Sequence, residues 1–530
     1  MNLMGRIINV TICLMLLTTI YVVTVPDEVR AVQTWYVDDV AGSSGPDDPP
    51  EDFTSIQSAI DAASDGDTIY VYSGIYYERI VIYRELTLEG EDKETTIIDS
   101  QGGGGAVKII ADWVNVRHFT IRNGEQGLFI TSSHVNIEDN IVEDFGWRAI
   151  SFHTSMDNNI IGNTVSSSNY GIIFSSSFDS IIAGNTITDT SYGLLSILSS
   201  QNTIENNNLS SNTIYGLCLQ GHSYNDVIGN DIWNNPIGIN MDLSASAFME
   251  GNYVSMSTRG INIYSYFAPT TPFITGNDIT HNDYGIIMNA HMSLCAPTIT
   301  GNSINDNIYA IKVGDDCTPI IFNNEIINND FGINYDPSSG LVVGNTIANN
   351  IYGIYAIDSD PTIIDNYIFN NDCGIYLDHS SPSIDSNTIT NNIIGIYCIN
   401  DSNPTLTNNI FSDNVFKMNP LILEIEITPE TLNLKSKGRW INCRIELPDI
   451  LDATYIDIST IKISDINGNP LNIPAAYHPT GAGIGTSSLI VKFDRLMVED
   501  YITPGDAEIS ITGEFIHGFI FEGSDSIRVI

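Results

Sequence analysis

Residues 344–377 read GNTIANNIYGIYAIDSDPTIIDNYIFNNDCGIYL, a stretch in which a unit of 21 residues ends and begins again. Asn345 and Asn366 stand at the same place in successive units, and so do Gly353 and Gly374. Each unit holds three short apolar runs separated by Asn, Asp and Ser, a composition that favours strands and turns over helices. The unit therefore predicts three short strands joined by tight corners, and its repetition predicts a solenoid.

Two marks recur in phase along most of the chain, and the steps of the first run from 21 to 25 residues. The first is an Asn two residues before an apolar residue, at Asn140, Asn163, Asn185, Asn207, Asn230, Asn252, Asn277, Asn302, Asn324, Asn345, Asn366, Asn387 and Asn408. The second is a small residue before an aliphatic one, at Gly127, Ala149, Gly171, Gly193, Gly216, Gly238, Gly260, Gly285, Ala310, Gly332, Gly353, Gly374 and Gly395. Together they predict an all-β fold: a right-handed parallel β-helix of three-strand rungs, repeating about every 22 residues, over residues 67–418.

The recurrent positions have structural explanations. Because side chains alternate along a strand, residues one and three places after the small residue should both face the core, as at Leu217/Leu219 and Ile375/Leu377. The Asn row should line one corner, where each amide donates to one neighbour and accepts from the other. A second Asn row and a Tyr row precede the small residue, and we expect all three rows to be structural.

The two ends of the solenoid read differently from its middle. Residues 32–66 should form an N-terminal cap that includes a short amphipathic helix, with Phe53, Ile56, Ile60 and Ala63 on one face. After residue 418 the repeat stops, and alternating runs such as Leu423-Glu-Ile-Glu-Ile predict a C-terminal antiparallel β-sandwich over residues 419–530.

Charge and the first residues bear on location and partners. The chain has 64 acidic and 20 basic residues and a net charge of −44, so its surface should repel nucleic acid, anionic lipid and polyanionic sugars. Residues 1–31 hold an apolar run from Ile7 to Val25, which predicts either a cleaved signal peptide or an uncleaved N-terminal membrane anchor. Either alternative predicts an extracellular or cell-surface protein.

Several segments carry a family resemblance. Trp35-Tyr-Val-Asp-Asp, Ser55-Ile-Gln-Ser-Ala-Ile-Asp and Gly66-Asp-Thr-Ile-Tyr-Val resemble the N-terminal cap of pectin-lyase-like β-helices. Repeats such as Gly344-Asn-Thr-Ile-Ala-Asn-Asn resemble those of the NosD-type and carbohydrate-binding/sugar-hydrolysis families. The resemblance runs from about Trp35 to about Asn414 and implies a fold but no particular activity.

The catalytic signatures of enzymes with this fold are incomplete. Gly314-Asp-Asp-Cys resembles a polygalacturonase motif, but the Gly-His-Gly and Arg-Ile-Lys segments that follow it in that family have no counterpart here. Polysaccharide lyases need cations to neutralise a uronate, and residues 150–415 contain only Arg259 and Lys312 besides histidines, so bound Ca²⁺ would have to serve. No confident catalytic residue emerges, so the residues favour a protein that is not an enzyme and leave an enzymatic role open.

The main hypothesis is a glycan-binding or structural protein of the cell envelope. Tyr355, Tyr376 and Tyr397 follow their Gly by two residues, so they should face outward on three successive rungs, flanked by Asp336 and Asp378. A flat aromatic strip edged by carboxylates suits a neutral polysaccharide or cell-envelope glycan. The alternative for the same tyrosines is a cross-strand ladder that stabilises the sheet.

Two other functions remain open. Asp336 and Asp378 could be the carboxylate pair of an inverting glycoside hydrolase, since two rungs separate them by roughly 9.6 Å. Met288, His291, Met292 and Cys295 cluster in one lengthened rung and offer soft ligands for copper, as the NosD resemblance implies.

Register also bears on the cysteines. Cys295 and Cys317 each precede their rung's Asn mark by seven residues, so they should be neighbours on adjacent rungs and within reach of a disulfide, either bonded or reduced. Cys373 and Cys398 are out of register, and both should be free.

Overall fold

The structure is a computed structural model that describes residues 31–39, 52–419, 421–448, 451, 453–476, 487–516 and 518–530. Nearly all of the expected signal or anchor segment, residues 1–30, lies outside the described residues. Among the described helices, none has the length and apolar character needed to cross a membrane.

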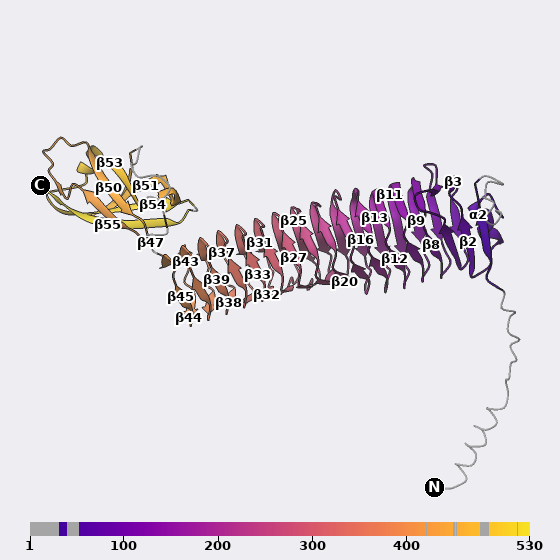
Figure 1. Ribbon diagram of the computed structural model, residues 1–530. Coiled ribbons are helices and arrows are strands. Elements are labelled where there is room, and N and C mark those ends of the chain that lie inside the picture. The colour runs from indigo at the N-terminus through magenta and orange to yellow at the C-terminus, as the bar shows by residue number, and fades with distance from the viewer. Residues whose placement is uncertain are drawn as a thin grey trace, which may run out of the picture.

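A long right-handed parallel β-helix forms most of the chain (Figure 1). One rung contains β38 (Thr362–Ile364), β39 (Tyr367–Phe369) and β40 (Cys373–Asp378), in that order. These pair in parallel with β41 (Ser383–Asp385), β42 (Thr388–Thr390) and β43 (Ile394–Ile399) of the next rung. The same pairing runs from β2 (Asp67–Val71) to β46 (Phe416–Met418), so the predicted three-strand rung is confirmed.

The N-terminal end is closed by a helix and extended by a strand. Helix α2 (Ile56–Ala62) is capped by the Ser55 side chain, which accepts from the Ser58 amide, and it buries Ile56, Ala59 and Ile60. Strand β1 (Thr34–Val37) pairs in parallel and in register with β2. The segment expected to be only a cap therefore also contributes a strand to the parallel sheet.

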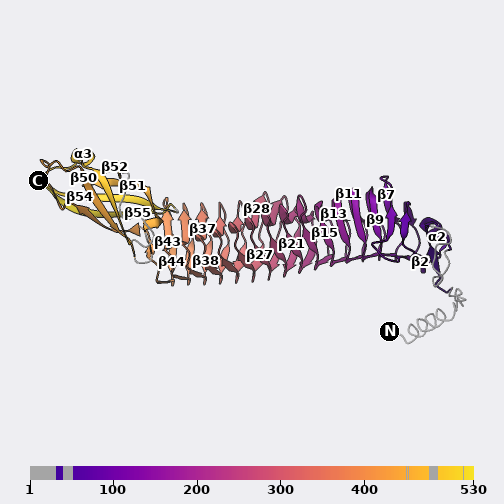
Figure 2. The same cartoon turned by 45° about the horizontal axis from the view of Figure 1, so that its top comes forward.

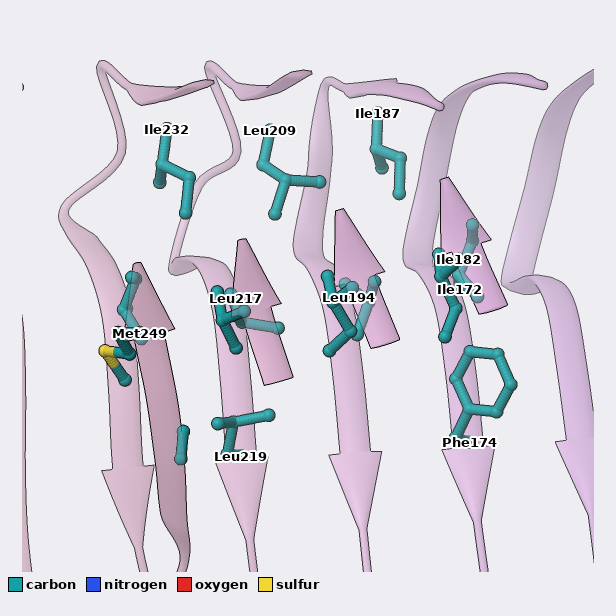
Figure 3. Close-up of a cluster of buried hydrophobic side chains, with 14 of the residues drawn as sticks. Ile172, Phe174, Ile182, Ile187, Leu194, Leu209, Leu217, Leu219, Ile232 and Met249 are labelled. Carbon is teal, nitrogen blue, oxygen red and sulfur yellow. The ribbon is translucent and has the colours of Figure 1, made fainter. Parts of the chain in front are cut away.

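Inside the rungs, aliphatic side chains form one continuous core along the solenoid, and Figure 3 shows Phe174, Leu194, Leu217 and Leu219 within it. All four are at most 1% exposed, as the alternation predicted. Steric contact between rungs explains why a small residue precedes the first core position in these strands. A Cβ added at Gly171 would lie 2.4 Å from the carbonyl oxygen of Gly193 on the next rung.

The first Asn row forms a buried hydrogen-bonded ladder from Asn140 to Asn387. Asn324 shows the pattern: its Oδ1 accepts from the backbone and side-chain nitrogens of Asn302 (3.0 and 2.9 Å), and its Nδ2 donates to Asn345 Oδ1 (3.0 Å). The prediction was wrong at the last step, because Asn387 donates to Asn409 rather than to Asn408. One extra residue in this rung turns Asn408 outward, where it is exposed and has a φ of 53°.

The C-terminal region consists of two mainly antiparallel sheets that share one core. One contains β47 (Leu421–Ile422), β49 (Thr431–Leu432), β51 (Ile456–Ile466), β52 (Asn469–Pro474), β54 (Gly505–Phe515) and β55 (Ile520–Val529). The other contains β48 (Glu424–Thr428), β50 (Trp440–Glu446) and β53 (Ser488–Asp494). Figures 1 and 2 show this domain beyond the last rungs of the solenoid, at the end opposite α2.

Candidate functional site

One row of outward-facing side chains, here called the outward row, runs along the whole solenoid with one residue per rung. Successive members are Cα partners in the parallel sheet. They are Val81, Lys108, Phe129, Ser151, Ile173, Leu195, Cys218, Asn240, Asn262, Ile287, Lys312, Asn334, Tyr355, Tyr376 and Tyr397. The predicted tyrosine strip is therefore the C-terminal end of a longer row.

The tyrosines stack as predicted, but they are not a free surface. Ring centroids are 4.5 Å apart for Tyr355 and Tyr376 and 5.8 Å apart for Tyr376 and Tyr397. Tyr397 is only 4% exposed, because the Phe519 ring of the C-terminal domain lies 5.2 Å from it and its Oη accepts from the Ile520 amide at 3.0 Å. The strip is less open than expected, because Tyr397 is buried against the second domain while Tyr355 and Tyr376 are half-buried. Glycan binding by this strip stays a prediction.

This contact predicts a measurable effect of Tyr397→Phe, because the Ile520 amide would lose its acceptor. Net hydrogen bonds contribute about 1 kcal/mol, so hydrogen exchange at Ile520 should be roughly fivefold faster. Tyr355→Phe is the matched control, since the described contacts of Tyr355 are all with aromatic rings of the solenoid. Equal exchange at Ile520 in both variants would show that Tyr397 does not hold the domain.

The two carboxylates proposed as a hydrolase pair have separate partners. Asp336 Oδ2 lies 4.0 Å from Lys312 Nζ. Asp378 Oδ1 accepts from Asn400 Nδ2 at 2.7 Å and lies 2.9 Å from His379 Nδ1. The structure places both beside the outward row, two rungs apart, but does not bring them to a common partner.

The four residues proposed as copper ligands lie on two sides of the sheet. Met288 and Cys295 are fully buried in the core, whereas His291 is exposed and Met292 is 73% exposed. In the part of the chain that the structure describes, no group of three His, Cys, Asp or Glu side chains is placed to hold a metal ion.

Cys295 and Cys317 are neighbours on adjacent rungs, joined by a parallel bridge, as their register predicted. Both are free and fully buried in this structure. Cys373 pairs with Ile394 and Cys398 with Leu377, so these two are out of register with each other and are also free.

A site that the sequence did not reveal lies at the N-terminal end of the outward row. A cavity of about 480 Å³, here called the Phe129 pocket, opens over β4 (Ile80–Ile82), β7 (Gly105–Ile109) and β9 (Thr120–Ile130). It is lined by Arg79, Ile80, Val81, Gly105, Val107, Lys108, Gln126 and Phe129. Two cations, one amide and one aromatic ring thus surround a partly apolar floor.

The next rung adds a third cation beside the pocket. On β11 (Ile141–His153), Arg148 lies in register with Gln126, and its guanidinium stands 3.7 Å from the centre of the Trp147 ring. Arg148 Nη1 donates to His153 Nε2 at 3.0 Å, and the His153 ring lies 5.1 Å from that of Phe129. Burial and the Arg148 charge both lower the pKa of His153, so its imidazole is neutral at neutral pH and accepts this bond.

Among the described residues, the cations of this site have no carboxylate partner. Elsewhere in the first rungs, Lys93, Arg117 and Arg122 each pair with a carboxylate. No carboxylate of the described residues lies within 4 Å of Arg79, Lys108 or Arg148. Arg148 Nε is moreover buried and has no hydrogen-bond partner in the described structure. The sequence held one signal of this site, because seven of its 20 basic residues fall between Arg79 and Arg148.

A comparison with solved structures found proteins with a distant likeness to this chain. The solved structures with similar folds include the Dettilon tailspike protein, at 13% identity and a TM-score of 0.43 over 83% of this chain and 91% of that one. They also include the A-module of a mannuronan C-5 epimerase from Azotobacter vinelandii, at 16% identity and a TM-score of 0.33 over 69% and 92%. A third is a tailspike mutant of E. coli bacteriophage HK620 in complex with a pentasaccharide, at 12% identity and a TM-score of 0.40 over 89% and 88%.

No curated protein matches the chain. A family model does: the model described as periplasmic copper-binding protein (NosD) matches residues 60–236, 192–294 and 296–420. These matches cover more than half of the chain and coincide with the repeating rungs. The chain therefore belongs to the NosD family of β-helix repeat proteins.

Proposed function

We propose that this protein is exported to the cell surface, where its β-helix binds a polysaccharide through the Phe129 pocket and the adjoining Arg148. The observation that carries the proposal is the combination, on one outer face, of a cavity, an aromatic ring and three cations that pair with no carboxylate in the described part of the chain. Location at the surface follows from the apolar segment Ile7–Val25, which is typical of exported chains.

The chemistry of the pocket suits a sugar. The Phe129 ring offers an apolar face for the C–H groups of a pyranose, and the Gln126 amide both donates to and accepts from hydroxyls. Arg79, Lys108 and Arg148 favour a glycan with acidic units, because hydrogen bonds between charged partners are the stronger ones. This replaces the neutral glycan expected at Tyr355, Tyr376 and Tyr397, whose strip is partly covered by the C-terminal domain.

The other two functions have less support. The family's description names copper, which in its reduced form prefers thiolate, thioether and imidazole ligands. Met288 and Cys295 are buried while His291 and Met292 are exposed, so these residues do not fit a shared copper site. Asp336 and Asp378 each have a separate partner, which gives no support to a hydrolytic pair.

Replacing Phe129 with Ala is expected to weaken glycan binding by at least about tenfold, because a stacking surface worth roughly 1.4 kcal/mol would be lost. The full chain would be screened against an array of neutral and acidic polysaccharides, and affinity for the best ligand then measured by calorimetry. Phe273→Ala is the matched control, since Phe273 is 38% exposed but lies on β26 (Phe273–Thr275) of another face. Wild-type protein that binds no glycan, or a Phe129 variant with unchanged affinity and unchanged circular dichroism, would refute the proposal.

A further inference from the structure

A row of small side chains lines one corner of the rungs just before the first strand, and serine is its commonest member. On either side of residues 270–317 its hydroxyls accept backbone amides of the preceding rung: Ser199 Oγ accepts from Ser177, and Ser359 Oγ accepts from Ser338, at 3.0 and 2.9 Å. In the middle the row continues through Thr270, Cys295 and Cys317, which are joined by parallel bridges, and then through Ser338, Ser359, Ser380 and Ser402. Two thiols thus replace hydroxyls at two successive rungs of a polar row.

This pair has the geometry of a cross-link. Both side chains are fully buried, and their residues form a parallel bridge between adjacent rungs. Neighbouring parallel strands lie about 4.8 Å apart, which falls inside the range of about 4.4–6.8 Å between the Cα atoms of a disulfide.

The remaining described cysteines have no cysteine partner in register. Cys218 pairs with Leu195 and Asn240, and Cys373 with Tyr352 and Ile394. Cys398 pairs with Leu377, and Cys443 belongs to β50 of the other domain. Among the described residues, therefore, only Cys295 and Cys317 are cysteines that lie opposite each other on adjacent rungs.

We propose that Cys295 and Cys317 form a disulfide that ties two successive rungs together, and that it forms before these rungs close. The oxidant is a small disulfide. One cysteine thiolate attacks it and forms a mixed disulfide, and one half of the oxidant leaves as a thiol. The second cysteine thiolate then attacks the mixed disulfide, and the other half of the oxidant leaves as a thiol. The protein loses two electrons and two protons, which the two leaving thiols carry away, so the exchange balances. The cross-link does not depend on the proposed glycan binding.

Burial explains both the timing and the use of such a bond. Hydrogen bonding to Cys295 and burial raise the pKa of the Cys317 thiol, so the folded protein holds little reactive thiolate there. Of the rungs marked by the first Asn row, the adjoining ones are also the longest, with 25 residues from Asn252 to Asn277 and 25 from Asn277 to Asn302. Thr270 Oγ1, in the same row, is buried without a hydrogen-bond partner in the described structure. This corner therefore lacks the hydrogen bond to a neighbouring backbone amide that Ser199 and Ser359 make.

The test is to refold the full chain with oxidised glutathione and, separately, with dithiothreitol. Each sample is then denatured without reductant, alkylated with N-ethylmaleimide, digested and analysed by mass spectrometry. The oxidised sample should yield one peptide pair linked through Cys295 and Cys317, with Cys218, Cys373, Cys398 and Cys443 alkylated. Alkylation of both Cys295 and Cys317 in that sample, or a different cysteine pairing, would overturn the proposal.

A second measurement checks that the bond ties the rungs. The oxidised wild type should melt about 2–4 °C above the reduced wild type, because the cross-link restricts the unfolded chain. The double variant Cys295→Ser, Cys317→Ser should fold, since serine is native to this row, and should show no difference between the two treatments. Equal melting of oxidised and reduced wild type, with the linked peptide present, would overturn the stabilising role.

Discussion

Asn324→Ala is expected to lower the free energy of unfolding by about 3 kcal/mol or more, because it removes a buried amide from the middle of the Asn ladder. Asn324 is 2% exposed. Its Nδ2 donates to the carbonyls of Ile299 and Phe322 and to Asn345 Oδ1, and its Oδ1 accepts twice from Asn302. Alanine would leave the backbone amide of Asn302 buried without its acceptor, a loss of about 1–3 kcal/mol, and would also remove the side-chain hydrogen bonds to Ile299, Phe322 and Asn345.

Urea denaturation followed by circular dichroism would measure this loss, and hydrogen exchange would locate it. A solenoid can open locally, so exchange should rise most in the rungs on either side of Asn324. The control is Asn408→Gly, which removes an exposed Asn outside the ladder and suits its left-handed φ of 53°. A loss of stability in the control as large as that in Asn324→Ala would contradict the ladder's role.

Gly353→Val is expected to destabilise the solenoid by about 3 kcal/mol, at the upper end of the usual range for overpacking, and to reduce the yield of soluble protein. A Cβ at Gly353 would lie 2.5 Å from the carbonyl oxygen of Gly374 and 3.3 Å from Ile368 Cγ2. The Gly374 carbonyl belongs to β40, which pairs with β37 on one side and β43 on the other. The clash can therefore be removed only if two rungs move apart.

A graded series tests the steric argument for Gly353. Gly353→Ala should cost less than the valine variant, because Ala149 and Ala310 occupy the same row in this chain. Gly146→Val is the control of equal size, since a Cβ there has Gly124 O at 3.9 Å as its nearest neighbour. Similar melting temperatures for Gly353→Val and the wild type would show that the rungs adapt to the added side chain.

The sequence by itself determined the rungs, the core and most of the ladders. Each rung repeats the same sequence pattern, with Asn at a corner, a small residue where two backbones approach, and aliphatic residues at alternate positions. Because a parallel solenoid places equivalent residues on top of one another, a regular spacing translates directly into contacts. That is why the partnership of Cys295 and Cys317 could be predicted, and why the single inserted residue near Asn408 was enough to make the prediction wrong there.

The tertiary structure decided what lies on the outer face. Arg79, Lys108 and Phe129 come from the first rungs, where loops of unequal length hide the register, so their meeting in one pocket has no counterpart in the repeat. The covering of Tyr397 by Phe519 joins residues more than a hundred positions apart, from domains with unrelated patterns. Repeats specify contacts between neighbouring rungs, whereas these two features depend on the paths of loops and on how a second domain packs, which only the folded chain determines.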